Sequence, residues 1–571
     1  MNQRKTRHLM TAALAFIVVA MTACSSSETG NGKGDGTSPP EPSTGSSTQP
    51  TSDNASSDPF AKYDPPIALT TVRIFDEVDK FAPGSTEKNI WLDGYLNELG
   101  IKVTYDWTVI GSQPGGPGEQ KMNVSIASGS LPDIIPVNAK QLKQLVDSDL
   151  VEDLSDYYPR LASPQLKQFL GEDSIALKSG TFGGKLMGLP TVTGSIDSAS
   201  MIWVRKDWLD KLGLPEPKTM KDVLAISKAF TNNDPDGNNK NDTFGIGLTK
   251  EVYNNGVFDI VALLEGYHGY HNQWIKDESG KLVYGGIQPE IKEGLAVLQE
   301  MFKNKEIDPE FGVKDTGKVI ESLVSGKIGM FFGQHWNAFW PLGDAMTKDP
   351  KADWRPYPIV SADDKPAKPI IGSGVTGYFA VKKGFAHPEA IIKLANMYID
   401  KKYGYETGGY DAEYNGTNED VRWKLGAVIQ TDPMQNIDIH RLVKKAIETG
   451  DPSVMGKNAG AIENYEGYQK FKKGEMSLKP GVLWSGPDNS ALSVLDYYLT
   501  NNLAINDEFF GASTETMVQK QSTLDKLKQE VYTRIILGDL PIDEFDKFVS
   551  DWKKLGGDEI TAEVNEWASS L

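Results

Sequence analysis

The sequence predicts an α/β protein that is exported and carries a polar segment ahead of its folded part. Short apolar strands alternate with amphipathic helices from about residue 60 onward, which is the pattern of α/β folds. The folded part, roughly Phe60 to Leu571, is long enough for two or more domains. No segment of linker-like composition divides it into sequential halves, which argues against two independent consecutive domains.

The chain begins with the pattern of a secretory signal peptide. Basic residues stand near the start, an apolar run follows from Leu9 to Ala20, and Met21-Thr22-Ala23 leads into Cys24. An apolar run of roughly a dozen residues is too short to cross a bilayer, which takes about 20 residues. We therefore predict that residues 1–23 are a signal peptide and not an anchoring helix.

Cys24 is the only cysteine of the chain, so an intramolecular disulfide is excluded. The residues around it resemble a bacterial lipobox, in which the cysteine thiol is acylated and becomes the first residue of the mature protein. The resemblance implies a membrane attachment through lipid, palmitate included; the alternative is an incidental thiol in a cleaved peptide. Nothing further along is long and apolar enough to span a membrane, and stable anchoring needs more than one acyl chain.

Residues 24–58 form a predicted disordered tether. They are mostly Ser, Thr, Gly, Pro, Asn and Asp with hardly an aliphatic side chain, and such a segment buries too little apolar surface to offset its conformational entropy. A flexible coil of this length holds the folded part some tens of Å from the lipid, by the scaling of about 5–6 Å times the square root of residue number.

The formal net charge of the chain is −19, and removal of the basic signal residues makes it about −22. This balance argues against nucleic acid as a partner and against adhesion to anionic lipid head groups. It does not exclude an acidic ligand, because a local basic patch is enough to hold one.

The folded part opens with strands and helices in the order β-α-β-α-β. This order predicts a parallel sheet with the ligand at the carboxyl ends of its strands. The predicted elements are a strand at Leu69–Phe75, a helix at Thr86–Leu99 capped by Gly100, a strand at Ile101–Trp107, a helix ending near Ala127 and a strand at Asp133–Val137.

A set of motifs then follows in order along nearly the whole folded part. The motifs are Ser128–Ile134, Gly183–Pro190, Trp203–Leu214, Gly280–Tyr284, Ser325–Phe331, Gly374–Ala380 and Leu555–Trp567. They resemble those of family 1 extracellular solute-binding proteins, and in particular the LplA-like lipoproteins of carbohydrate ABC transporters in Gram-positive bacteria. No single motif is decisive; their shared order carries the resemblance.

The resemblance implies a periplasmic-binding-protein-like fold of type II. In this α/β fold two lobes are joined by a hinge of crossing strands, and the ligand cleft lies between the lobes. By position, we expect lobe I at residues 59–192 and 372–440, and lobe II at residues 193–371 and 441–571.

The resemblance also implies a function. The chain is expected to be a lipid-anchored, monomeric protein on the outer face of the cytoplasmic membrane of a Gram-positive cell. It would capture an extracellular oligosaccharide by lobe closure and deliver it to the permease subunits of an ABC importer. Two alternatives stay open: a co-receptor that presents its ligand to a membrane sensor kinase, and a surface carbohydrate-active enzyme.

Catalysis is the weaker alternative. The sequence has no G-x-S-x-G, H-E-x-x-H or Walker motif. A glycosidase needs only two carboxylates about 5–9 Å apart, and carboxylates are too abundant for the sequence to exclude such a pair. We expect a protein that binds a solute and is not an enzyme.

One acidic loop has the ligand spacing of a calcium site of EF-hand type. Oxygen ligands at loop positions 1, 3, 5 and 9, with a backbone carbonyl at position 7, suit Ca²⁺. The predicted ligands are Asp234, Asp236, Asn238, Asp242 and the carbonyl of Lys240. Position 12 is Gly245, so the usual bidentate Glu is missing, and position 6 is Asn239, which tolerates a left-handed turn. The resemblance implies a structural role, because related alginate-binding proteins hold calcium in a similar loop; the alternative is a solvated turn.

A sugar site needs flat apolar faces for pyranose rings, flanked by groups that hydrogen-bond hydroxyls. The segment Gly333–Trp340 combines both and follows a strand-like apolar run. Its candidate ligand-binding residues are Trp336 as the stacking platform, with Gln334, His335, Asn337 and Trp340. The alternative for Trp336 and Trp340 is core packing.

Further candidates follow from where the expected cleft falls along the chain. Each lies at a strand end, at a lobe crossing or in a Gly/Pro loop. They are Asp76, Glu77, Asn138, Asp197, Thr376, Tyr378 and Trp484. Taken singly, each has a structural alternative, and we expect about a third of the set to contact the ligand.

Overall fold

The computed structural model describes residues 58–171, 174–253, 256–404, 411–417 and 420–570. The predicted signal peptide, Cys24 and the predicted tether up to residue 57 therefore lie outside the described residues. Among the described residues, no helix combines the length and apolarity that a membrane span requires.

The described strands are short and fall into separate small sheets. Their bounds are β1 (Ile67–Phe75), β2 (Ile101–Ile110), β3 (Ile134–Val137), β4 (Thr181–Phe182), β5 (Lys185–Leu186), β6 (Leu189–Val192), β7 (Met201–Arg205), β8 (Trp274–Lys276), β9 (Leu282–Tyr284), β10 (Met330–Gly333), β11 (Trp354–Tyr357), β12 (Ile370–Ile371), β13 (Val375–Val381) and β14 (Ile505–Asn506).

The first lobe is organised around β1, β2, β3, β6 and β13. Strands β1 and β2 run parallel, and β13 lies between β3 and β6 and runs antiparallel to both. A side chain of β1 contacts the backbone at the start of β3: the hydroxyl of Thr71 donates to the carbonyl of Ile134 at 2.9 Å. The predicted parallel arrangement therefore holds for β1 and β2, but the lobe also contains an antiparallel strand, which enters from the distant segment 375–381.

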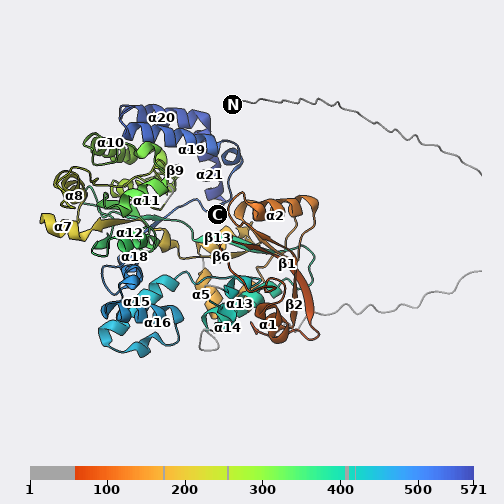
Figure 1. The fold of residues 1–571 in the computed structure, drawn as a ribbon. Helices are drawn as coiled ribbons and strands as arrows, with labels where there is room; N and C mark the ends of the chain where they lie inside the picture. Colours follow the sequence, from red (N-terminus) through yellow and green to blue (C-terminus); the bar gives the residue numbers. More distant parts are fainter. Residues whose placement is uncertain (1–57, 172–173, 254–255, 405–410, 418–419, 571) are drawn as a thin grey trace, which may run out of the picture. The chain divides into compact units, whose positions relative to one another are not determined.

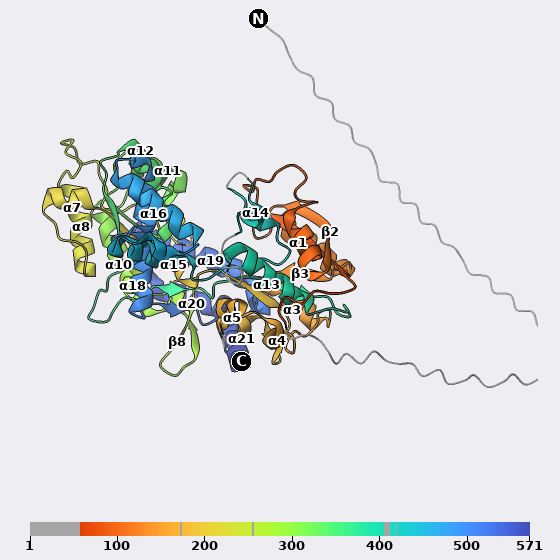
Figure 2. The ribbon, with the colours of Figure 1, turned by 90° about the horizontal axis from the view of Figure 1, so that it is seen from below.

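The helices of lobe I pack against these strands, and α1, α13 and α14 lie side by side in both views (Figures 1 and 2). Their bounds are α1 (Ile90–Leu99), α2 (Pro117–Ser128), α3 (Ala139–Asp147), α4 (Tyr158–Leu161), α5 (Pro164–Leu170), α6 (Ile175–Ser179), α13 (Ala390–Tyr403) and α14 (Ala412–Asn415).

Helix α1 shows how local sequence sets its ends. The side chain of Asn89 accepts hydrogen bonds from the backbone N–H groups of Trp91 and Leu92, so the helix begins there and not at Thr86. At the other end Gly100 has φ 67°, the left-handed conformation expected of a C-terminal glycine. A side chain at Gly100 would also meet the backbone of Tyr63.

Lobe II is built on the small antiparallel sheet β10-β7-β11 and a large set of helices. All residues of β7 are buried, as expected for a strand covered on both faces. The helices are α7 (Lys206–Leu212), α8 (Met220–Asn232), α9 (Val261–Gly266), α10 (Pro289–Lys303), α11 (Thr316–Val324), α12 (Leu342–Lys348), α15 (Gln435–Thr449), α16 (Ala459–Lys472), α17 (Lys479–Ser485), α18 (Ala491–Thr500), α19 (Glu515–Ile536), α20 (Glu544–Trp552) and α21 (Asp558–Ser569).

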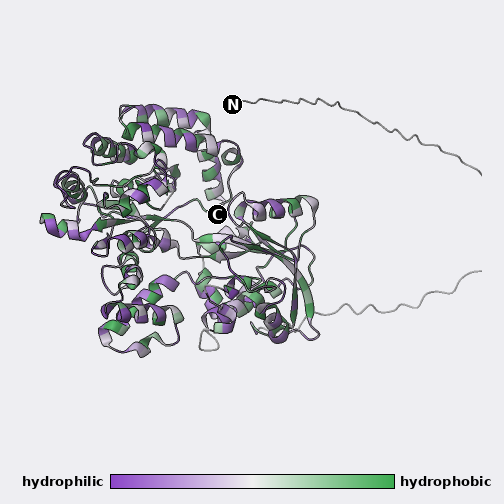
Figure 3. Cartoon of the chain, viewed as in Figure 1, coloured by the Kyte–Doolittle hydropathy of each residue, from purple (hydrophilic) through white to green (hydrophobic). Residues whose placement is uncertain are grey.

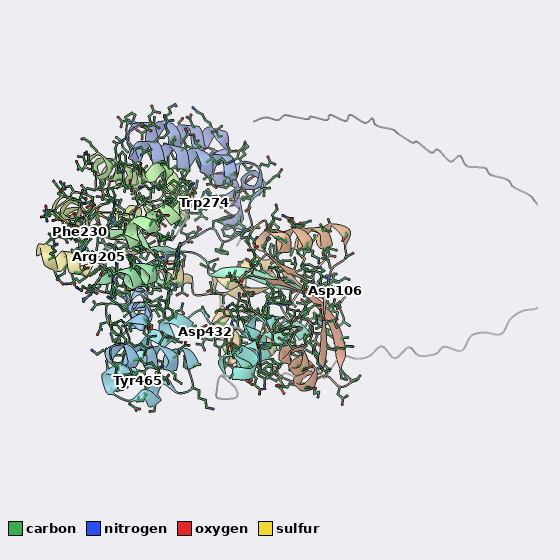
Figure 4. The ribbon with its side chains drawn as sticks, viewed as in Figure 1. Asp106, Arg205, Phe230, Trp274, Asp432 and Tyr465 are labelled. Atoms are coloured by element: carbon green, nitrogen blue, oxygen red, sulfur yellow. The ribbon has the colours of Figure 1, made fainter. Side chains whose placement is uncertain are left out.

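The core of lobe II is rich in aromatic side chains. The guanidinium of Arg205 lies 4.7 Å from the ring centroid of Trp208. The rings of Trp208 and Phe230 pack perpendicular to each other with centroids 5.3 Å apart; Arg205 and Phe230 are labelled in Figure 4. A side chain at Gly329 would meet the rings of both Trp208 and Phe230, so glycine is needed for this packing. Figure 3 shows the corresponding alternation of hydrophobic and hydrophilic residues along the helices.

The chain crosses between the two sets of elements more than once. A first segment joins β6 to β7 through a 3₁₀ turn, η1 (Ser195–Ser198), and a second joins β12 to β13. A third, residues 429–436, leads from a stretch that packs in the core of lobe I into the first turn of α15. The lobe boundaries expected from the sequence remain predictions at the level of single residues.

Candidate functional site

Lobe I contains a cavity of about 460 Å³ at the carboxyl ends of its strands. Phe75 and Asp76 stand at the end of β1, and Val137 and Asn138 at the end of β3, and all four line the cavity. This is where an α/β sheet is expected to hold a ligand.

Within the lobe I cavity, one lysine pairs with two carboxylates. The ammonium of Lys424 lies 2.6 Å from a carboxylate oxygen of Asp76 and also pairs with Asp79. The hydrogen bond from Lys424, with a second from Ser112, holds the pKa of Asp76 below its ordinary value. The buried guanidinium of Arg73 donates to the backbone carbonyl of Lys424.

The remaining lobe I candidates surround this cavity in different ways. Asn138 lines it, but its side chain caps α3 by accepting from the N–H of Gln141 at 2.9 Å. Thr376 lines it and is exposed, whereas Tyr378 lines it with a side chain that is only 4% exposed. Glu77 is exposed and lies outside the cavity lining.

Lobe II contains a second, more polar cavity of about 360 Å³. Asp259, Glu265, Gln273 and Gln334 are among its lining residues. Oε1 of Glu265 accepts from the N–H of Ile370 at 2.9 Å, and Oε2 has no hydrogen-bond partner within the described part of the chain. Burial raises the pKa of Glu265 to about 8, so this carboxyl is protonated at neutral pH.

An aromatic platform extends from the edge of the lobe II cavity on the turn η4 (His335–Ala338). The rings of Trp336 and Trp340 stack with centroids 5.9 Å apart and an interplanar angle of 19°. Trp340 is 43% exposed and Phe339 is 48% exposed. Gln334 accepts from Trp336 Nε1 at 2.8 Å and donates to the carbonyl of Ser198 at 3.1 Å. Hydrogen bonds through Gln334 therefore connect the platform to the first crossing segment.

His335 and Trp484 form a second aromatic contact beside this platform. Trp484 lies on α17 and not in the loop that the sequence predicted. Its indole N–H donates to Nδ1 of His335 at 2.9 Å. Burial lowers the pKa of His335 to about 4, so the imidazole is neutral and its Nδ1 is free to accept. Trp484 also packs against Phe339, with centroids 5.5 Å apart.

Asn337 has a different position from its neighbours in the same motif. Its side chain is fully buried, and its Oδ1 accepts from the N–H of Gln334 at 2.9 Å. A side chain at Gly333 would collide with this oxygen. Asn337 thus shapes the turn that presents Trp336 and Trp340, and we leave it out of the proposed contact surface.

Asp197 lies on η1 in the first crossing segment. Its Oδ2 accepts from the side-chain amide of Asn436 at 2.9 Å. Burial raises the pKa of Asp197 to about 6. The residue therefore connects two crossing segments, in a position suited to a hinge.

The acidic loop folds as a series of tight turns. Asp234 accepts from the backbone N–H groups of Gly237, Asn238 and Asn239 at 3.0 to 3.1 Å, and Asn239 has φ 59°, the left-handed conformation expected at position 6. The amide of Asn238 donates to Asp236 at 2.7 Å and to Asp242 at 2.9 Å.

These contacts gather the oxygen-bearing side chains of the acidic loop in one place. The donor set of carboxylates, an amide and a backbone carbonyl suits Ca²⁺ chemically. Among the described residues, no three His, Cys, Asp or Glu side chains by themselves have the spacing of a metal site. An ion here would therefore need the Asn238 amide oxygen and a carbonyl to complete its ligands.

Sequence reasoning missed several residues that line the cavities. Trp423 and Lys424 precede the third crossing segment, and Lys424 is 348 positions from its partner Asp76. Asp259 lies just before the short helix α9, and Glu265 belongs to that helix. Glu265 offered one signal, because a single carboxylate inside an otherwise apolar helix is unusual.

Comparisons with known proteins agree with this architecture. The chain is 24% identical over 470 residues to the polygalacturonan/rhamnogalacturonan-binding protein YtcQ of Bacillus subtilis (strain 168), and the match covers 79% of this chain and 84% of YtcQ.

Solved structures show the same fold at lower identity. The alginate-binding protein AlgQ2, solved without calcium ion, is similar with a TM-score of 0.53 and 14% identity over 89% of this chain and 99% of that chain. The FusA substrate-binding protein of S. pneumoniae, solved as an EF-hand mutant with fructo-nystose, is similar with a TM-score of 0.52 and 17% identity over 88% and 98%. The predicted two-lobe α/β fold of type II is thereby confirmed.

A family model described as bacterial extracellular solute-binding protein matches residues 79–405, more than half of the chain. The prediction of a binding protein and not an enzyme is confirmed by this match and by the solute-binding relatives. The chain belongs to the family of bacterial extracellular solute-binding proteins.

Proposed function

We propose that the protein is the substrate-binding lipoprotein of an ABC importer and that its solute is an oligosaccharide. The observation that carries this proposal is the stacked Trp336–Trp340 pair at the edge of a polar cavity, in which Trp340 is exposed and Trp336 is partly buried against the lobe II core. Flat aromatic faces suit the CH faces of sugar rings, and the neighbouring amides and carboxyls suit their hydroxyls. Two relatives support the same class: the polygalacturonan/rhamnogalacturonan-binding protein YtcQ and the fructooligosaccharide ABC transporter substrate-binding protein FusA.

Capture works by closure of the lobes on the solute. Each lobe contributes a cavity of its own, so a solute that touches both stabilises the closed state by its differential affinity for that state. The crossing segments at 192–201, 371–375 and 429–436 supply the hinge. The closed complex then delivers its sugar to membrane permeases.

Retention at the cell surface is proposed to depend on Cys24. Acylation of its thiol would hold the protein on the outer face of the cytoplasmic membrane of a Gram-positive cell, and residues 24–58 would give the monomeric receptor room to reach its permease. In cells that express Cys24→Ala, the protein should appear in the medium, and labelled palmitate should not be incorporated. Unchanged membrane retention of this variant contradicts the anchor.

The acidic loop is proposed to hold a structural Ca²⁺ ion. The ligands would be Asp234, Asp236, Asn238, Asp242 and the carbonyl of Lys240. Two structurally similar proteins support the assignment: AlgQ2, which was solved without calcium ion, and FusA, which was solved as an EF-hand mutant. Bound calcium would cross-link the loop that follows α8 and would stabilise lobe II without touching the solute.

Calorimetric titration of the mature chain tests the binding function. The probe protein starts at residue 24 and carries Cys24→Ser, which removes the acylation site. We expect saturable heat with at least one member of a panel of plant and microbial oligosaccharides, and no heat with di- to hexapeptides. Binding of peptides alone would contradict the proposal, and sugar uptake that persists in a permease deletion strain would contradict the importer role.

A further inference from the structure

We propose that the solute is a neutral oligosaccharide and that glycans bearing uronic acid carboxylates bind weakly or not at all. This inference rests on the proposed sugar-binding function and specifies its substrate class. It follows from the charges that line the two cavities.

Among the described lining residues of the lobe I cavity, three carboxylates outnumber two cations: Asp76, Asp79 and Glu119 against Arg73 and Lys424. Lys424 is committed to Asp76 and Asp79. Arg73 is buried, and one guanidinium nitrogen donates to a backbone carbonyl, while its Nε is buried without a hydrogen-bond partner among the described residues. Its positive charge contributes to the lowered pKa of Asp76. Glu119, whose Oε2 accepts from a backbone N–H at 2.8 Å, adds a further negative charge to the lining.

The lobe II cavity is lined by carboxyls and hydroxyls. Asp259 and the protonated carboxyl of Glu265 line it, and no Lys or Arg does so in the part of the chain that the structure describes. His271 also lines it, but burial holds its pKa well below the ordinary value, so the ring is neutral. Its other polar lining groups include Ser198 and Ser200.

One ammonium group lies behind the lobe II cavity without reaching it. Lys528 has a fully buried side chain. It donates to the carbonyl of His271 at 3.0 Å, to Asn272 at 2.8 Å and to the hydroxyl of Tyr284. These bonds use its three N–H groups, so Lys528 offers no donor to a ligand.

Acidic sugars and neutral sugars meet these linings differently. A uronate carboxylate needs an Arg fork or other unoccupied donors to replace its hydration, and it is repelled by fixed carboxylates. A neutral sugar presents hydroxyls, which both donate to carboxylates and accept from amides. The net charge of the mature chain, about −22, adds a long-range barrier to anions. The named ligand of YtcQ, polygalacturonan, is acidic, so the inference separates this chain from that relative.

Paired titrations test the inference. Calorimetry on the mature Cys24→Ser chain compares sugars that differ only at C6, such as α-1,4-linked galactotriose with trigalacturonate and mannotriose with the mannuronate trimer. Within every pair that binds, we expect the neutral member to bind at least about tenfold more tightly. Added salt should reduce this difference in affinity, because it screens the repulsion between the uronate and the carboxylates of the cavities.

Charge-neutralising variants sharpen the comparison. Asp259→Asn and Glu119→Gln, one in each cavity, should each reduce the ratio of affinities between the neutral and the acidic member of a pair severalfold. Asp277→Asn, in an exposed turn outside both linings, should leave it unchanged. Having variants in both lobes keeps the test valid if one of them fails to fold.

The outcomes separate the two levels of the proposal. An acidic member that binds as tightly as its neutral partner, or more tightly, overturns the inference and leaves the sugar-binding function standing. The absence of heat with every sugar, acidic or neutral, overturns both.

Discussion

The side-chain amide of Asn436 donates a hydrogen bond to Oδ2 of Asp197 at 2.9 Å, and this bond joins the first crossing segment to the third. The other carboxylate oxygen of Asp197 is buried and has no hydrogen-bond partner among the described residues. Because the amide of Asn436 is the partner of a buried acid, its hydrogen bond is expected to stabilise the folded state more when that acid is ionised.

Asn436→Ala should therefore destabilise the protein in a pH-dependent way. Burial raises the pKa of Asp197 from 3.8 to about 6, so the folded state holds a proton that the unfolded state has released, and stability falls as pH rises across this window. Without the amide of Asn436, the folded state that contains ionised Asp197 is destabilised by a further ~1–3 kcal/mol. Urea unfolding should show a larger loss at pH 7.5 than at pH 5.

An exposed asparagine provides the control for this variant. Asn97 lies on the surface of α1, and Asn97→Ala should change the free energy of unfolding little at either pH. An equal loss for Asn436→Ala at pH 5 and pH 7.5 would show that ionisation of Asp197 does not set the cost.

Trp336→Ala should weaken sugar binding by at least about tenfold, or ~1.4 kcal/mol. The substitution removes the ring that stacks on Trp340 and leaves the exposed partner unsupported. Trp107→Ala, in lobe I outside the cavity lining, is the matched control and should keep the affinity. Calorimetry with a sugar that the parent protein binds measures the affinity of both variants. An equal loss of affinity in the two variants would argue against a stacking role for Trp336.

Chelation should lower the melting temperature if calcium binds the acidic loop. At a calcium concentration of ~100 times the dissociation constant, bound ion contributes about 2.7 kcal/mol. Asp236→Asn removes a charged ligand, so its melting temperature should no longer respond to chelator. Asp277 caps a similar exposed turn, and Asp277→Asn should retain the response. No change with chelator in the parent protein, with no metal by elemental analysis, contradicts the calcium site.

Glu265→Gln should flatten the dependence of stability on pH. The pKa of Glu265 is raised from 4.5 to about 8 by burial. Between these values the folded state retains a proton that the unfolded state loses, so stability falls with rising pH, by up to ~1.4 kcal/mol per pH unit. Above pH 8 this dependence ends. Thermal or urea unfolding from pH 5 to 8 should show a shallower decline in the variant, and identical slopes would refute the assignment.

Several structural features could be predicted from a few neighbouring residues. The cap at Gly100 and the left-handed turn at Asn239 occur where expected, because both depend on local backbone preferences. The strand after Gly100 starts as predicted and runs three residues further, to Ile110. Helix α1 starts later than predicted, since the side chain of Asn89 competes for its first turn.

The candidate site was predictable only in part. The motif Gly333–Trp340 indicated an aromatic cluster, and the structure exposes Trp340 but buries Asn337 in the same turn. The direction in which each side chain points depends on the turn, which is fixed by packing around Gly256 and Gly333. Composition alone does not contain that information.

The sequence by itself determined the export signal pattern, the order of strands and helices, the left-handed turn at Asn239 and the family resemblance, because each is encoded in short or ordered stretches of chain. Only the tertiary structure decided which charges meet in the cavities. Lys424 pairs with Asp76, which lies 348 positions away in the sequence. Lys528 is buried and donates to the backbone carbonyl of His271. Electrostatic interactions depend on distance in space and on burial, and neither can be read from separation along the chain.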